Sequence, residues 1–202
     1  MDRHKMMQPK DLRLGIIGLS EGNGHPYSWS AIFNGYNREV MAKCPYPVIP
    51  EYLSSQFFPH DAIQGAKVTH VWAQERAIAE NIAAASLIPH IVSYYEDMIG
   101  QIDAILLARD DAENHLKMSI PFLDAGLPIY IDKPIALTLD DIESLYSYQQ
   151  YNGQIFSCSA MRFSEELQLS ALDRENLGDI GHIQAVIPKS WKNMEFILST
   201  QF

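Results

Sequence analysis

The chain has 202 residues, of which 47% are hydrophobic and 20% charged, an ordinary composition for a soluble protein with a buried core. Its net charge is −10, from 25 acidic against 15 basic residues, and no basic cluster is present to bind a phosphate backbone, so we expect no nucleic-acid partner. The polar N-terminus has no signal-peptide core, and no apolar run approaches the roughly 20 residues that cross a bilayer, so we expect a cytoplasmic protein without membrane contact. Cys44 and Cys158 lack metal-ligand spacing, which indicates neither a metal site nor a disulfide framework.

Apolar runs of strand length alternate with amphipathic helical segments, which predicts an α/β fold with a parallel sheet built from βαβ units. We expect strands at 12–18, 67–73, 90–92, 102–108, 127–131 and 154–159. The clearest helix covers 111–125, with Asp110 or Asp111 as its cap, a kink at Pro121 and Gly126 as its stop. Another helix follows a capping box that begins at Thr138.

Two stretches depart from this alternation. Residues 34–65 contain prolines and aromatic residues without clear periodicity, and we interpret them as a surface insertion rather than a functional loop. After Ser159 the pattern changes to a helical stretch at 164–176, a glycine turn and an apolar strand at 183–187. These features indicate the opening of a second unit.

The first strand runs into a glycine-rich turn, and a probable helix follows it. Glycines at a strand-to-helix turn let the backbone approach a pyrophosphate, and a helix N-terminus offers unpaired N–H groups and a partial positive charge. The candidate cofactor contacts in this turn are Gly18, Leu19, Ser20, Gly22, Gly24 and His25. The spacing departs from G-x-G-x-x-G, so a plain glycine-rich surface turn is the competing interpretation.

Two further strand ends carry candidate cofactor contacts. The second strand should end in an acid that binds the adenosine ribose of NAD, and Glu75 is the candidate, unless it simply begins the next helix. Arg76 could instead favour a 2′-phosphate, so NAD and NADP both stay open. Ala108 and Arg109 lie at the end of the fourth strand, with His115 one turn into the next helix, where they could line the cofactor crevice. The alternative is that Asp110 or Asp111 only caps the helix and His115 is solvated.

The glycine turn, then ARDDAENH, then AGLPIYIDKP, in that order and spacing, resemble the Gfo/Idh/MocA oxidoreductases over residues 12–191. The resemblance implies a Rossmann-type doubly wound parallel sheet at 1–159 that binds NAD or NADP. It implies that 160–202 begin an α+β second domain, which supplies the substrate pocket and homo-oligomer contacts in this family. The implied reaction is hydride transfer between the nicotinamide cofactor and a hydroxyl-bearing carbon of a sugar, sugar derivative or cyclitol, so a small polyol or sugar-like substrate is the expected partner.

The DKP run at the end of the fifth strand is the most specific part of the resemblance. Lys133 matches the lysine of the family motif, where it would contact cofactor and substrate, stabilise alkoxide charge and relay a proton. Asp132 and Pro134 flank it at the cofactor site, and Pro134 could follow a cis peptide bond. Arg162, in the stretch CSAMRFSEELQ, matches a short motif near the active site, where it could bind substrate or form a structural ion pair.

The family's second domain is longer than the residues that follow Ser159, and it carries a histidine that partners the lysine. One back-translation of Asn193–Phe202, read in a neighbouring frame, gives Tyr-Gly-Ile-His-Ile-Ile-Asp-Pro-Ile, the continuation that the resemblance implies. We therefore expect a one-base frameshift and a truncated second domain, which sequencing the coding DNA past Trp191 would test.

Two other functions stay open. A catalytically silent nucleotide-binding module, acting through a partner or left as a remnant, would keep the cofactor half alone. A methyltransferase also places a glycine turn after its first strand, but the DKP strand end has no role in that chemistry.

Overall fold

The computed structural model describes residues 11–165, 168–179 and 181–182. Six parallel strands form one sheet in the order β3-β2-β1-β4-β5-β6. They are β1 (Leu12–Ile17), β2 (Ala66–Trp72), β3 (His90–Ile91), β4 (Ala104–Leu107), β5 (Ile129–Ile131) and β6 (Ile155–Phe156). The strand order reverses between β1 and β4, which confirms the doubly wound Rossmann-type fold. The six predicted strands are confirmed, and the largest difference is at β6, which ends three residues before the predicted Ser159.

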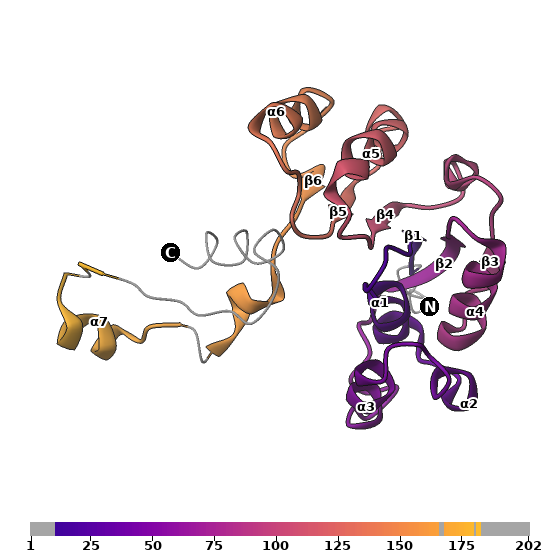
Figure 1. The fold of residues 1–202 in the computed structure, drawn as a ribbon, viewed down its shortest axis with the longest axis horizontal. Coiled ribbons are helices and arrows are strands. Elements are labelled where there is room, and N and C mark those ends of the chain that lie inside the picture. Colours follow the sequence, from indigo (N-terminus) through magenta and orange to yellow (C-terminus); the bar gives the residue numbers. More distant parts are fainter. Residues whose placement is uncertain (1–10, 166–167, 180, 183–202) are drawn as a thin grey trace, which may run out of the picture.

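Helices cover the two faces of the sheet over different strands (Figure 1). The buried side chains form two hydrophobic clusters, one on each face of the sheet. In one, α1 (His25–Asn34) and α4 (Arg76–Ser86) pack over β1 and β2; in the other, α5 (His115–Asp124) and α6 (Leu139–Ser147) pack over β4, β5 and β6. Ile16 and Ile17 of β1 are both fully buried, one in each cluster, because successive strand residues point to opposite faces. On the face of α1, Leu106 and Tyr130 are half-buried and Phe156 is exposed.

The segment 34–65 is not a surface insertion, so that interpretation was wrong. It forms α2 (Arg38–Met41) and α3 (Val48–Ser54), and their side chains Met41 and Leu53 are fully buried in the cluster under α1 and α4. Single apolar residues on such short helices give no periodicity to detect in the sequence.

The predicted helix at 111–125 is divided into a 3₁₀ turn, η2 (Ala112–Asn114), and α5. Asp111 precedes η2 but its side chain caps no backbone N–H, so the expected cap is wrong there. Gly126 ends α5 with a positive φ of 74°, as expected. Thr138 is confirmed as the cap of α6, because its hydroxyl accepts a hydrogen bond from Asp141 N at 3.1 Å.

After β6 the described chain forms η3 (Ala160–Phe163) and α7 (Ala171–Leu177), so the helix expected at 164–176 begins later than predicted. Figure 1 shows α7 apart from the sheet, and all its residues are exposed. The strand expected at 183–187 lies outside the described residues. In the ranges that the structure describes, no helix is long and apolar enough to cross a membrane.

Candidate cofactor and substrate site

The site lies at the carboxyl edge of the sheet, where the strand order reverses. Three segments meet there: the glycine turn after β1, the segment 108–111 after β4, and the loop that begins at Asp132 after β5. Loops at this edge of a doubly wound sheet form the crevice in which such folds bind their ligands.

Asp132 joins two of these segments. It is 1% exposed, and its Oδ2 accepts a hydrogen bond from Asn23 Nδ2 at 2.8 Å and lies 2.5 Å from His25 Nδ1. Its Oδ1 accepts from the backbone N of Lys133 at 2.8 Å. A buried carboxylate is costly unless its oxygens are satisfied, so this set of contacts holds the glycine turn and the DKP loop in one fixed arrangement.

Lys133 is half-buried and faces a hollow of about 560 Å³. Its Nζ makes no hydrogen bond or ion pair with any residue that the structure describes. Asp132 and His25 form the polar rim, and the apolar wall comes from α1, β4 and β5. The wall residues include Trp29, Ile32, Phe33, Leu106 and Tyr130. An ammonium that has no partner in the described part of the chain and lies beside such a cavity can bind a ligand hydroxyl.

Aromatic rings brace the polar rim of this hollow. The Trp29 ring stacks on His25 at 4.8 Å between centroids and meets Tyr130 edge-on at 5.1 Å. Burial, together with a hydrogen bond to Cys158, raises the pKa of Tyr130, so its hydroxyl stays neutral and donates to Cys158 O at 3.1 Å. The peptide bond between Lys133 and Pro134 is cis, as the sequence suggested.

The first turn of α1 offers no free N–H group, which contradicts the expectation from the sequence. His25 N donates to the side chain of Asn23 at 2.8 Å, Pro26 has no N–H, and Tyr27 N donates to Gly24 O at 3.0 Å. A phosphate at this helix end would therefore find the donors of the first turn in use, although the backbone N of Gly24, just before the helix, makes no hydrogen bond within the described residues.

The glycine turn itself keeps some open donors. Within the described part of the chain, the backbone N atoms of Ser20, Glu21 and Gly22 make no hydrogen bond. Gly22 has a φ of 79°, and an added Cβ there would meet nothing within 4 Å. The Ser20 hydroxyl donates to Asp110 Oδ1 at 2.6 Å, which links the turn to the segment after β4.

Arg109 makes a second link between the glycine turn and the segment after β4. It is 8% exposed; its Nε and Nη2 donate to the two carboxylate oxygens of Asp111 at 2.8 and 2.6 Å. Its Nη1 donates to Leu19 O at 3.1 Å and to Gln74 Oε1 at 3.0 Å. Burial raises the pKa of Asp111, but the hydrogen bonds and charge of Arg109 outweigh this and hold that pKa below its usual value.

His115 is fully buried rather than solvated. Its Nδ1 lies 3.1 Å from Ile135 O and its Nε2 lies 2.9 Å from Arg109 O. Both ring nitrogens therefore face backbone carbonyls, and the ring holds the segment after β4 against the DKP loop instead of lining the crevice. Ala108 is likewise fully buried and extends the pairing of β4 with β1, since its N donates to Ile17 O at 2.8 Å.

A second hollow, of about 620 Å³, lies at the carboxyl ends of β2 and β3. Gln74 and Arg76 line it and Glu75 does not, although Glu75 is exposed and sits between them. Gln74 Oε1 already accepts hydrogen bonds from Leu19 N and Arg109, so only its amide nitrogen is left for a ligand. Arg76 pairs with Glu80 through Nε alone, at 3.0 Å, with both side chains 58% exposed.

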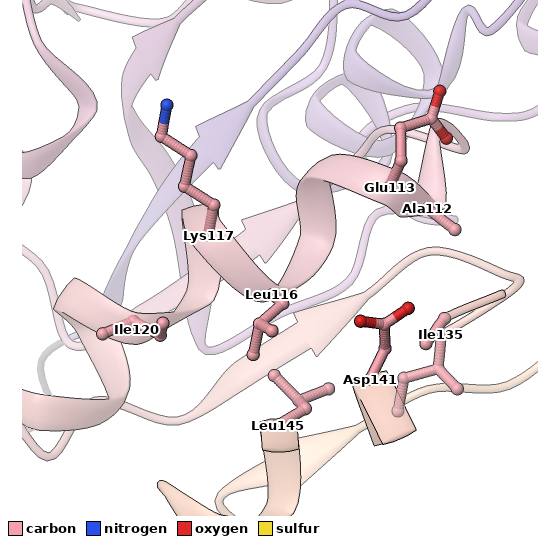
Figure 2. Close-up of a pocket in the computed structure, with 9 residues that line it drawn as sticks. Ala112, Glu113, Leu116, Lys117, Ile120, Ile135, Asp141 and Leu145 are labelled. Atoms are coloured by element: carbon pink, nitrogen blue, oxygen red, sulfur yellow. The ribbon is translucent and has the colours of Figure 1, made fainter. Parts of the chain in front are cut away.

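A third hollow, of about 250 Å³, lies between α5 and α6, behind the DKP loop (Figure 2). Its floor is apolar, and Figure 2 shows the Lys117 ammonium pointing away from it. No predicted site residue lines it. Arg162 lies on η3, exposed, and its side chain forms neither an ion pair within the described residues nor part of the wall beside Lys133.

The two larger hollows could each hold one nucleotide of a dinucleotide, but the hydrogen bonds between these hollows restrict the space for its pyrophosphate. One large hollow lies at the carboxyl ends of β2 and β3, and the other runs from His25 and Lys133 along the face of β4 and β5 that α1 covers. In the strand order, β1 and its glycine turn lie between the two, as the two nucleotides of NAD or NADP would require. The Arg109 and Ser20 links cross that turn. Sequence reasoning missed the roles of Asn23 and Gln74, although both stood beside residues that it singled out.

Residues 12–159 match the family model described as the oxidoreductase family with an NAD-binding Rossmann fold, Gfo/Idh/MocA. The chain belongs to this family. The resemblance found in the sequence is thus confirmed over most of the chain, and the family assignment identifies the sheet as an NAD-binding Rossmann domain. No match was found among curated proteins.

Solved structures of similar fold include myo-inositol 2-dehydrogenase from Lactobacillus plantarum, with 22% identity and a TM-score of 0.55, covering 86% of this chain and 43% of that one. Another is scyllo-inositol dehydrogenase from Lactobacillus casei with bound NAD(H) and scyllo-inositol, with 20% identity and a TM-score of 0.58, covering 84% and 43%. At these identities the likeness shows the fold alone. The chain spans less than half the length of these relatives.

Proposed function

We propose that this chain is an oxidoreductase that transfers hydride between NAD or NADP and a hydroxyl-bearing carbon of a sugar, sugar derivative or cyclitol. The observation that carries the proposal is the Lys133 ammonium, which has no partner among the described residues and borders a hollow that begins at the carboxyl edge of the sheet. The backbone of Lys133 is bound by Asp132, which also binds Asn23 of the glycine turn. Family membership and the fold shared with inositol dehydrogenases support the substrate class.

Lys133 would act directly on the substrate. Its ammonium can donate a hydrogen bond to the substrate hydroxyl, stabilise the developing alkoxide and relay the proton that leaves the hydroxyl. The nicotinamide, when bound, supplies hydride acceptance and donation. Asp132 and Pro134 would set the direction of the Lys133 backbone, and the apolar wall on one side of Lys133 would limit the water that reaches the reacting groups.

The remaining predicted contacts belong to the same proposal. Residues of the glycine turn would lie along the cofactor phosphates, and residues 160–202 would begin the substrate domain, with Arg162 reaching substrate from it. Homo-oligomer contacts would follow the family pattern, and the cytoplasmic location expected from the sequence is part of the same proposal.

A silent nucleotide-binding module is the second candidate. One observation favours it: the Arg109 and Ser20 links join the glycine turn to the segment after β4, across the crevice between the two hollows. Such a module would bind cofactor without turning over substrate.

Fluorescence titration with NADH and NADPH, followed by assays of cyclitol and sugar oxidation, tests the proposal. We expect saturable binding, and turnover that falls about a hundredfold or more in Lys133→Met while cofactor binding persists. Lys117→Met, which removes an exposed lysine of α5, is the matched control and should change neither. Binding without turnover would favour the silent module. No binding of either nucleotide would overturn both readings, and saturable S-adenosylmethionine binding would then favour a methyltransferase.

A further inference from the structure

We propose that Arg109 is the residue that binds the cofactor pyrophosphate, with Asp111 holding it ready for that purpose. This inference rests on the proposed function, since it requires that a dinucleotide crosses the glycine turn. It assigns to one side chain the role that a helix N-terminus ordinarily fills in this fold.

The need for such a residue comes from α1. The N–H groups of His25 and Tyr27 donate to Asn23 and Gly24, and Pro26 has none, so the first turn of the helix supplies fewer phosphate donors than usual. The open backbone N atoms of the turn, at 20–22, provide donors but no positive charge. Around them stand the carboxylates of Glu21 and Asp110, which repel phosphate. A cation is therefore required close to the turn.

Arg109 is the cation that the fold brings there. Its Nη1 contacts Leu19 O in the glycine turn and Gln74 Oε1 at the end of β2, which places the guanidinium across the gap between the two large hollows. A dinucleotide that occupies both hollows must pass through this gap. The Arg109 side chain is 9% exposed, so its interaction with an anion would be screened little by solvent.

The way Arg109 is held suits an exchange of partners. The carboxylate of Asp111 accepts two hydrogen bonds from one edge of the guanidinium, at 2.8 and 2.6 Å, and fixes its orientation. The edge that faces the turn contacts only neutral oxygen acceptors. Phosphate oxygens form stronger, charge-assisted hydrogen bonds with arginine than neutral carbonyls do, so bound pyrophosphate would displace Leu19 O and Gln74 Oε1. Little side-chain entropy is lost because the side chain is already ordered.

The same exchange would open the crevice. When Nη1 turns to phosphate, Gln74 is released from its bond to Arg109, and the link between the end of β2 and the segment after β4 is broken. Arg109 would thus close the crevice when no cofactor is bound and would bind pyrophosphate when the cofactor enters. The closed crevice therefore does not by itself imply a silent module.

Binding measurements on Arg109→Gln in the full chain test the inference, with ligands that differ in phosphate. NADH and ADP are titrated by calorimetry, and adenosine, which lacks phosphate, by NMR. We expect Arg109→Gln to weaken NADH and ADP by about tenfold to a hundredfold and to leave adenosine unchanged. Arg109→Lys should recover part of the loss, because an ammonium restores the positive charge but cannot bind Asp111 along one edge and phosphate along the other as a guanidinium can.

The control variant is Arg13→Gln. Arg13 also forms a two-bonded pair with an aspartate, Asp103, but at the start of β1 and so at the opposite edge of the sheet. It should not change any of the three affinities. Thermal unfolding of each variant is measured alongside.

The outcomes separate the two proposals. If wild type binds NADH and Arg109→Gln binds it equally well, the inference is overturned and the proposed function stands. If Arg109→Gln weakens adenosine as much as ADP, Arg109 only supports the fold and the inference is overturned. If wild type binds neither NADH nor NADPH, the proposed function fails and the inference fails with it.

Discussion

Asp132 and Asn23, 109 residues apart in the chain, share a hydrogen bond of 2.8 Å that fastens the DKP loop to the glycine turn. The contact matters because each partner belongs to a different half of the site: Asn23 stands in the turn that a phosphate would approach, and Asp132 precedes Lys133. Positioning of the cofactor and positioning of the proposed catalytic ammonium are thus coupled through one buried carboxylate.

Asp132→Asn should therefore weaken both stability and cofactor binding. An amide offers one acceptor oxygen where the carboxylate has two, so it cannot serve Asn23, His25 and the Lys133 backbone together. We expect the free energy of unfolding to fall by about 2 kcal/mol, as measured by urea denaturation. Asp124→Asn, an exposed change at the end of α5, should stay within about 0.5 kcal/mol of wild type.

The strands were predictable because a parallel sheet buries both faces, and its central strands therefore read as continuous apolar runs such as Ala104–Leu107. Lys133 was predictable because its neighbours in the sequence carry the family motif. The Arg109 network was not, since its partners Leu19 and Gln74 are 90 and 35 residues away and no local pattern records them. The prediction that Asp111 caps the helix failed for a related reason: its carboxylate binds Arg109 instead of a backbone N–H.

Gly18→Ala should destabilise the protein by displacing the start of α1. A Cβ added at Gly18 would lie 2.1 Å from Cγ of Pro26, a rigid ring that cannot rotate away. Such overpacking costs about 1–3 kcal/mol, and it should also lower affinity for NADH because the turn moves. Gly181→Ala, where an added Cβ meets nothing within 4 Å, is the matched control and should leave the denaturation midpoint unchanged. Equal stability of the two variants would show that α1 adapts freely.

Arg76→Ala should lower affinity for NADPH about tenfold and leave affinity for NADH unchanged. Arg76 lines the hollow at the end of β2, and only NADPH carries a 2′-phosphate for it to contact. Glu75→Gln should change neither affinity, because Glu75 does not line that hollow. Paired fluorescence titrations of the two variants check this. A loss of NADH affinity in Glu75→Gln would instead identify Glu75 as the ribose ligand of an NAD-specific protein.

Asp111→Asn should destabilise the protein at neutral pH, with an effect that disappears in acid. Arg109 holds the pKa of Asp111 below its usual value of about 3.9, so the folded state binds this proton more weakly than the unfolded state. The stabilisation is therefore fully present above the unfolded pKa and is lost as pH falls through the folded pKa. We expect a cost of about 3 kcal/mol at pH 6, where the partly buried partner of buried Arg109 is removed, and a shrinking difference between variant and wild type below about pH 4. Urea denaturation of both proteins across this range gives the measurement, and a difference that stays constant down to pH 3 would show that the Asp111 charge does not stabilise the fold.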